Sequence, residues 1–149
     1  MENEIIAYNH TQDILSDVRS IIESAQAVAH HSINIALLQR NWLLGKRIVE
    51  EELQGKDRAE YGASIIKNLS KELTDIYGKR FTKSNLYSFY SFYKSFPQIF
   101  QSVIGKSQLL SWTHYLTLMQ VPDEQARKWY ENEAANETVL STKYRRYII

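Results

Sequence analysis

The chain has 149 residues, of which 44% are hydrophobic, with 5 Gly, 2 Pro, no Cys and a formal net charge of +1. This composition indicates a compact helical protein of about one domain, and it excludes disulfides, a thiolate metal site and a cysteine nucleophile. The N-terminal residues Met1 to Glu4 are acidic with no apolar run behind them, and no segment reaches the roughly 20 apolar residues that span a bilayer. We therefore expect a cytoplasmic protein without a signal peptide or a membrane partner.

The first long element is an amphipathic helix. Residues 1–10 are expected to form a flexible tail, and residues 11–149 a single helical domain. From Thr11 to Leu53, apolar residues recur in steps of three and four, which is typical of such a helix. A continuous helix here would be roughly 65 Å long, longer than a domain of this size is wide. We expect either a bend near His30–Ser32 or a helix that projects and pairs with a second chain, which leaves a homodimer open.

Two further helices and the turn between them follow. The spacing Asp57-x-x-Glu60 predicts a capping box at the start of the second helix, and Gly78 predicts its end. Thr82 is a suitable N-cap for the third helix, which Pro97 ends. The two helices are separated by about four residues that include a glycine, which is the spacing of a helix-turn-helix. The predicted fold is all-α: a long N-terminal helix packed with a helix-turn-helix-like core and two or three further short helices.

The C-terminal third predicts shorter elements. Ser111 can cap a helix over Trp112–Gln120, and Pro122 stands where the start of another helix tolerates it. The last segment, Ser141–Ile149, stops abruptly on apolar residues. We expect that the polypeptide is a fragment cut just after a helix.

No catalytic constellation is found. The four histidines include no pair at i, i+4, and Ser111 with His114 is better explained by structural hydrogen bonding than by catalysis. Pro122-Asp123 has no Glu-x-Lys to complete a metal-dependent nuclease motif. The adjacent residues Glu50–Glu52 point about 100° apart and cannot converge on one metal ion. We predict no catalytic residue, no metal and no cofactor, so the chain as given is not an enzyme.

The remaining candidate chemistry is nucleic-acid binding. From Lys67 to Lys106 there are seven basic and two acidic residues, a local charge of +5 that favours a polyanion partner such as DNA. A recognition helix reaches base edges with its first turns, while nearby cations hold phosphates. The candidate binding residues are Lys83, Asn85, Tyr87 and Ser88 in those first turns, and Lys71, Lys79, Arg80 and Lys94 for phosphates.

Three other interpretations stay open for these residues. The charge also fits a solvated helix face. Asn85 can cap its own helix, and a face rich in Ser and Tyr can pack against another protein. Lys79, Arg80 and Lys83 at the turn are therefore better candidates than the face beyond them.

Several short motifs occur in a fixed order along the chain: Trp42-Leu43-Leu44-Gly45-Lys46-x-Ile48, Tyr61-Gly62, Leu69-Ser70-x-x-Leu73, Phe81-Thr82-x-x-Asn85-Leu86, Phe92-Tyr93 and Leu110-Ser111-Trp112-Thr113-His114-Tyr115. Together, from about Ala25 to the last residue, they resemble the N-terminal domain of the DUF1016 (YhcG-like) bacterial proteins. The resemblance implies a helical module of the DNA-binding helix-turn-helix or winged-helix type. It also implies that a PD-(D/E)xK nuclease-like domain, absent from this chain, follows as a partner.

One departure concerns the helix after the turn. Members of the family often carry basic residues there, whereas this chain has Ser88 and Tyr90. We expect weaker phosphate binding by this helix, or binding through Tyr stacking and the flanking lysines. The predicted function is a non-catalytic DNA-binding module of a nuclease. The alternative is a protein-interaction or homodimerisation module built on the long first helix.

Overall fold

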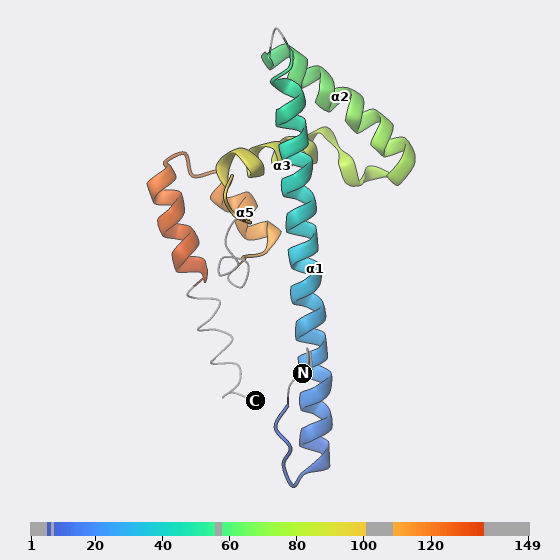
Figure 1. Cartoon of the computed structure of the whole chain (residues 1–149), viewed down its shortest axis with the longest axis vertical. Helices are drawn as coiled ribbons and strands as arrows, with labels where there is room; N and C mark the ends of the chain where they lie inside the picture. The colour runs from blue at the N-terminus through green and yellow to red at the C-terminus, as the bar shows by residue number, and fades with distance from the viewer. Residues whose placement is uncertain (1–5, 7, 56–57, 101–108, 136–149) are drawn as a thin grey trace. The chain divides into compact units, whose positions relative to one another are not determined.

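A computed structural model of the chain describes residues 6, 8–55, 58–100 and 109–135. These residues form helices and no strand, so the all-α prediction is confirmed (Figure 1). The elements are α1 (Ile14–Glu52), α2 (Arg58–Tyr77), the 3-10 turn η1 (Lys79–Phe81), α3 (Lys83–Ser95), α5 (Trp112–Leu118) and a helix over residues 124–135. Contacts divide the chain into two compact units, Met1–Leu37 and Leu38–Ile149. The long helix α1 contributes to both.

In the first unit, hydrogen bonds define the start of α1. The backbone N–H of Thr11 donates to both carboxylate oxygens of Asp17 at 3.1 and 3.0 Å, and its hydroxyl donates to Oδ1 at 2.7 Å. Asp13 Oδ1 accepts from the Leu15 N–H at 3.2 Å, as an N-cap side chain does. The helix is not interrupted at His30–Ser32, where the sequence left a bend open.

The second unit is built around α3. Its buried side chains form two clusters: Leu38, Phe92, Phe96, Leu110, Tyr115 and Leu118 in one, and Ile48, Ile66, Leu86 and Phe89 in the other. Helix α3 supplies residues to both clusters, and Trp112 of α5 packs against both. The Trp112 ring stands edge-on to Phe92, with centroids 5.0 Å apart. Aromatic side chains of α3 therefore join α1, α2 and α5 into one core.

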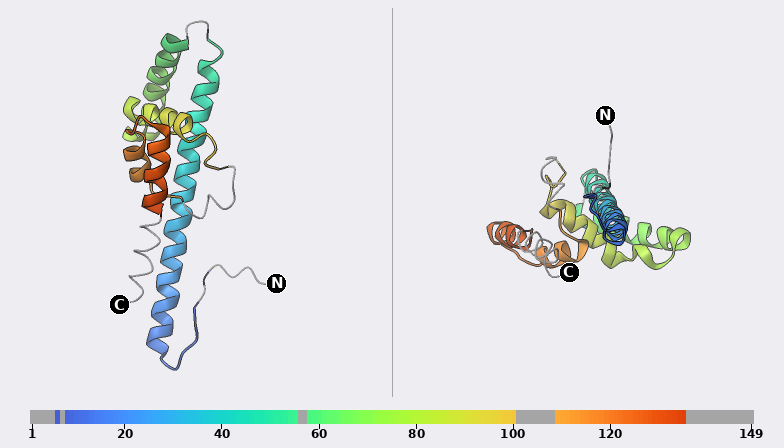
Figure 2. Two further views of the ribbon diagram at one scale, coloured as in Figure 1. Left: turned by 90° about the vertical axis from the view of Figure 1, so that its left-hand side faces the viewer. Right: turned by 90° about the horizontal axis from the view of Figure 1, so that it is seen from below.

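Helices α1 and α3 approach closely at Gly45. A Cβ atom at this position would lie 2.0 Å from the backbone oxygen of Phe89, so only glycine fits. Nearby, the Trp42 indole N–H donates to the Phe96 backbone oxygen at 3.0 Å. Figures 1 and 2 both show α3 crossing this part of α1.

The helix-turn-helix arrangement is present in α2, η1 and α3. Gly78 ends α2 with a φ of 84°, a value that glycine adopts without steric cost. Thr82 is the N-cap of α3 and accepts from the Asn85 N–H at 3.2 Å. Phe81 and Leu86, the two hydrophobic-staple positions, pack in the same cluster. The predicted stop and cap are confirmed, whereas Asp57 of the predicted capping box lies outside the described residues.

The C-terminal elements are also capped locally. Ser111 is the N-cap of α5, as predicted, but α5 ends at Leu118 rather than at Gln120. Asp123 caps the following helix, because its carboxylate accepts from the Gln125 N–H at 3.2 Å, and Pro122 stands directly before this cap. The last segment, 141–149, where the chain was expected to be cut just after a helix, lies outside the described residues. Within the described residues, no helix is both long enough and apolar enough to cross a membrane.

Candidate nucleic-acid interface

Three of the predicted cations lie together at the turn between α2 and α3. Lys79 and Arg80 are in η1, Lys83 is in the first turn of α3, and all three are exposed. Phe81, between them in sequence, is half-buried, packs against the core and meets the Tyr77 ring at 5.7 Å. We call these three cations the basic turn. Because Phe81 is held in the core, the backbone that carries them is fixed to the protein.

Asn85 connects the basic turn to α3. Its side-chain Nδ2 donates to the backbone oxygen of Arg80 at 2.9 Å, and its backbone N–H donates to Thr82 Oγ1. The residue is exposed. One amide hydrogen is therefore used to hold the turn, while the second hydrogen and the Oδ1 acceptor are the pair that an adenine edge would need.

Arg40 of α1 is a fourth cation at this site, and it was missed from the sequence. Its guanidinium carbon lies 5.5 Å from the centre of the Phe81 ring and 5.9 Å from that of Phe89. Its Nε and Nη2 donate to Asn41 Oδ1 at 3.0 and 2.9 Å, yet the residue is exposed. A guanidinium held in this way is oriented in advance for an anion. No local pattern could have revealed it, because Arg40 and Phe81 are far apart in the sequence.

Lys94 lies at the other end of α3. Its Nζ donates to the Tyr90 hydroxyl at 3.3 Å and lies 5.0 Å from the centre of that ring. The same hydroxyl donates to Glu52 Oε1 of α1 at 3.2 Å. Along the helix axis, Lys94 is roughly 16 Å from Lys83. The structure therefore gives Lys94 a contact within α3, to the tyrosine whose hydroxyl ties α3 to α1, and does not bring it to the basic turn.

The other predicted residues differ in how exposed their side chains are to a ligand. Tyr87 is 44% exposed. Ser88 is half-buried, and its hydroxyl donates to the Ser84 backbone oxygen at 3.0 Å. Lys71 is exposed on α2, a helix that also carries the exposed Glu72 and Asp75. Of these, Tyr87 is the best placed for a ligand beside the basic turn.

Acidic residues are absent from a long stretch of the chain that includes the basic turn. No Asp or Glu occurs from Ile76 to Pro122, a range that contains η1, α3 and α5. The basic turn therefore has no acidic residue in η1, α3 or α5, and the nearest ones before it in sequence are Glu72 and Asp75 of α2. Uncompensated cations at a fixed turn are the electrostatic arrangement that phosphates prefer.

Ser111 and His114 are explained by helix capping. The two side chains are 2.7 Å apart between Oγ and Nδ1, and the His114 N–H donates to the same Oγ at 3.4 Å. Both residues are exposed. The Ser111 hydroxyl accepts a hydrogen bond from a backbone amide in the first turn of α5, so it acts as an N-cap. No group of His, Asp or Glu residues suited to a metal ion occurs within the described ranges.

The groups of the second unit with shifted pKa values lie in and near the core. Burial raises the pKa of Tyr115 to about 12, although the Leu110 N–H donates to its hydroxyl at 3.3 Å. Burial also raises the pKa of Glu131, against the lowering effect of Lys128 and Arg127. Both shifts follow from packing.

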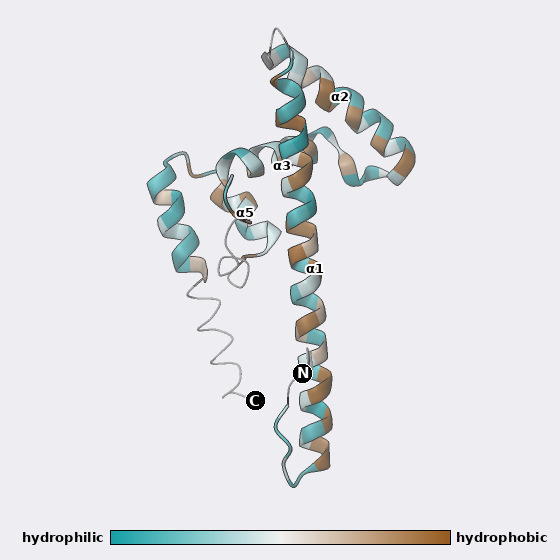
Figure 3. Cartoon of the chain, in the orientation of Figure 1, coloured by the Kyte–Doolittle hydropathy of each residue, from teal (hydrophilic) through white to brown (hydrophobic). Residues whose placement is uncertain are grey.

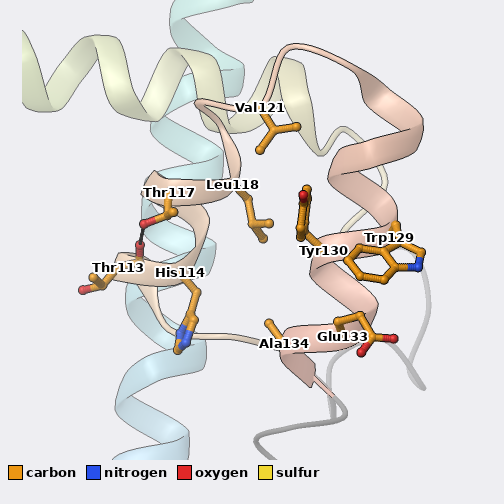
Figure 4. A pocket seen from close by; sticks show the side chains of 9 residues that line it. All are labelled: Thr113, His114, Thr117, Leu118, Val121, Trp129, Tyr130, Glu133 and Ala134. Carbon is orange, nitrogen blue, oxygen red and sulfur yellow. Dashed lines mark hydrogen bonds between the residues drawn. The ribbon is translucent and has the colours of Figure 1, made fainter.

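An open pocket of about 640 Å³ lies between α5 and the helix over residues 124–135 (Figure 4). Its lining residues are Thr113, His114, Thr117, Leu118, Val121, Trp129, Tyr130, Glu133 and Ala134. They include a carboxylate and two exposed aromatic rings but no Lys or Arg. This pocket is therefore unsuited to a phosphate, and the basic turn is the better candidate for nucleic acid.

Comparisons with known proteins give a matching family model and a similar bacterial protein. Residues 17–148 match the model of the family described as the DUF1016 N-terminal domain. The chain is also similar to the Escherichia coli (strain K12) protein named "Putative nuclease YhcG", with 31% identity over 150 residues. That similarity covers 82% of this chain but 40% of the relative, so the chain spans less than half of the relative's length. No solved structure matches.

Proposed function

The chain belongs to the DUF1016 N-terminal domain family, and we propose that it is a non-catalytic module that binds duplex DNA through the basic turn. In a whole protein of the length of its relative, this module would hold a nuclease domain on the DNA. The chemistry would then belong to the part of the relative that this chain does not cover, since no Glu-x-Lys accompanies Pro122-Asp123 here. The proposed DNA ligand would also put the site of action in the cytoplasm of a bacterial cell.

This proposal rests on four cations that lie around Phe81. Lys79, Arg80 and Lys83 are exposed at the turn, and Arg40 lies over the Phe81 ring. Contacts to phosphates supply most of the sequence-independent affinity for DNA and set the register of the protein on the duplex. Four cations on a backbone that is held in the core would therefore bind the phosphates of the DNA backbone.

The first turn of α3 would supply the contacts to bases. In helix-turn-helix proteins, the N-terminal residues of the second helix reach base edges in the major groove. Asn85 is held there by its bond to the Arg80 oxygen, and Tyr87 is exposed one turn into the helix. Asn85 would read adenine, and Tyr87 would contact a neighbouring base or sugar. Lys94, at the far end of α3, would contribute little.

The experiment is a salt titration of binding to a fluorescent duplex of mixed sequence, followed by anisotropy. Each phosphate contact contributes a log–log slope of about −0.9, so four contacts predict a slope near −3.6 and roughly a hundredfold loss of affinity between about 50 and 200 mM salt. Absence of binding at the lowest salt would refute the proposal.

Variants then locate the site. Arg80→Ala combined with Lys83→Ala should reduce the slope by about 1.8, and Arg40→Gln alone by about 0.9. Lys128→Ala is the matched control, because Lys128 is an exposed lysine of the second unit that pairs with Glu124 at 3.7 Å. If the control lowers the slope as much as the turn variants do, binding is not at the basic turn.

A further inference from the structure

The first unit carries an apolar surface that DNA binding does not use. Over residues 14–36 of α1, apolar and small side chains recur at spacings of three and four. They are Ile14, Leu15, Val18, Ile21, Ile22, Ala25, Val28, Ala29, Ser32, Ile33, Ile35 and Ala36, which we call the α1 stripe. At about 100° per residue, all of these positions fall within a sector about 160° wide. The stripe is therefore one continuous face of the helix.

Much of this face is exposed. Among residues 14–37 only Asp17 is buried, and Ile21, Ala25, Val28 and Ile35 of the stripe are half-buried. Ile14 is 79% exposed, Leu15 63% and Ile33 57%. Figure 3 shows hydrophobic residues recurring along the N-terminal part of α1. Aliphatic side chains in such numbers on one helix face mark a contact surface, whereas isolated exposed ones do not.

The spacing indicates what kind of surface would cover the stripe. Within it, Ile14, Val18, Ile21, Ala25, Val28, Ser32 and Ile35 alternate steps of four and three. This is the heptad spacing of helices that pack side by side over many turns. The partner is therefore a helix of similar length, about 35 Å, with a matching apolar face.

The buried positions of α1 in the second unit lie on a different face of the helix from the stripe. The buried residues of α1 in that unit, Leu38, Asn41, Gly45 and Ile48, also follow steps of three and four. They do not continue the heptad series, whose next positions after Ile35 are the exposed Gln39 and the half-buried Trp42, which packs against the core of the second unit. Apart from Trp42, the two parts of α1 use separate sets of positions.

The charges favour a second copy as the partner. Residues 14–37 contain three charged side chains, of which Arg19 and Glu23 lie outside the sector of the stripe and Asp17 lies at its edge, at the same angle as Ile35. Asp17 binds Thr11, while Arg19 and Glu23 pair with each other at 3.9 Å. An uncharged stripe meets its own copy without repulsion, and a two-fold axis places identical stripes face to face. Covering both would bury on the order of 1,000 Å² of surface, which is the lower bound for a specific interface.

We propose that the α1 stripe is a homodimer interface, in which α1 of one chain packs along α1 of a second copy. This inference does not depend on DNA binding, and its test contains no DNA. Sedimentation equilibrium of the 149-residue chain, from about 1 to 500 µM, should show a mass rising from 17.5 kDa towards twice that value. A constant monomer mass up to the highest concentration would overturn the proposal.

A matched pair of variants tests the face. Ala25→Glu places a charge in the middle of the stripe and should weaken association at least about tenfold. Ala27→Glu introduces the same residue two positions later, about 200° around the helix, and should leave the dissociation constant within about twofold. Ile21→Glu, one turn before Ala25 in the stripe, should act as Ala25→Glu does. Equal dimerisation by all three variants, with helicity unchanged, would show that the copies associate elsewhere.

Discussion

The two parts of α1 have similar local sequence character but different surroundings. In the first unit, the helix carries aliphatic residues on nearly every turn, yet among residues 14–37 only Asp17 is buried. In the second unit, the same helix buries Leu38, Asn41, Gly45 and Ile48 under α3 and its neighbours. Periodicity alone makes both parts amphipathic. What separates them is whether another element of the chain supplies side chains to cover the apolar face.

The largest expected effect comes from two adjacent leucines on either side of the unit boundary. Leu38 is fully buried, whereas Leu37 is 41% exposed. Leu38→Ala should lower the free energy of unfolding of the second unit by about 3 kcal/mol, because it leaves a cavity beside Phe92 and Tyr115. Leu37→Ala should lower it by less than about 1 kcal/mol.

Urea denaturation followed by circular dichroism measures both variants. Since the two share the residue type, the helix and the substitution, only their surroundings differ. Equal losses of stability would contradict the division of α1 into a covered part and an uncovered part.

The next largest effect is expected at Gly45, where α1 and α3 cross. Gly45→Ala would place a methyl group 2.0 Å from the Phe89 backbone oxygen, and backbone atoms cannot move aside without shifting α3. We expect a loss of about 1–3 kcal/mol in the free energy of unfolding, although alanine favours helix more than glycine does. Ala27→Glu in the uncovered part should stay within about 0.5 kcal/mol of the parent. A stabilised Gly45→Ala protein would show that the two helices do not cross this closely.

The smallest expected effect concerns the start of α1 and depends on pH. The hydroxyl and the backbone N–H of Thr11 hold the pKa of Asp17 below its usual value of 3.8. A carboxyl whose folded-state pKa is lowered adds stability above the unfolded pKa, and that stability is lost as the pH falls through the folded pKa. We therefore expect the first turn of α1 to fray only below about pH 3.8.

Amide signals of Thr11 and Asp17 in a pH titration by NMR would follow this fraying. Thr11→Val keeps the N–H but removes the hydroxyl, so the pKa of Asp17 should move up towards 3.8. An unchanged pKa in this variant would mean that the hydroxyl does not hold the carboxylate.

Helix caps and helix ends were predicted from the sequence because interactions between residues a few positions apart determine them. Thr82 and Ser111 cap their helices through the amide three residues later, and Gly78 ends α2 with a positive φ. At the start of the C-terminal helix, Asp123 accepts from the Gln125 N–H, a cap that was not predicted from the sequence. In each case the deciding atoms are only a few residues apart.

Contacts between distant segments were not predictable in the same way. Lys94, a predicted phosphate contact, donates to Tyr90 on its own helix, and the Tyr90 hydroxyl reaches Glu52 of α1. Arg40 was not considered for the site, yet it lies over Phe81. The Tyr90–Glu52 and Arg40–Phe81 contacts join α1 to residues far along the chain, which no spacing within one helix encodes.

The sequence by itself determined the helical class, the caps, the turn between α2 and α3 and the cations on that turn, because periodicity and capping act over a few residues. Only the tertiary structure decided which part of α1 is covered, that Gly45 touches the backbone of α3, and that Arg40 joins the basic turn while Lys94 does not. These features depend on packing between segments far apart in the chain. The free energy gained by burying aromatic side chains there favours one arrangement of the helices over the others.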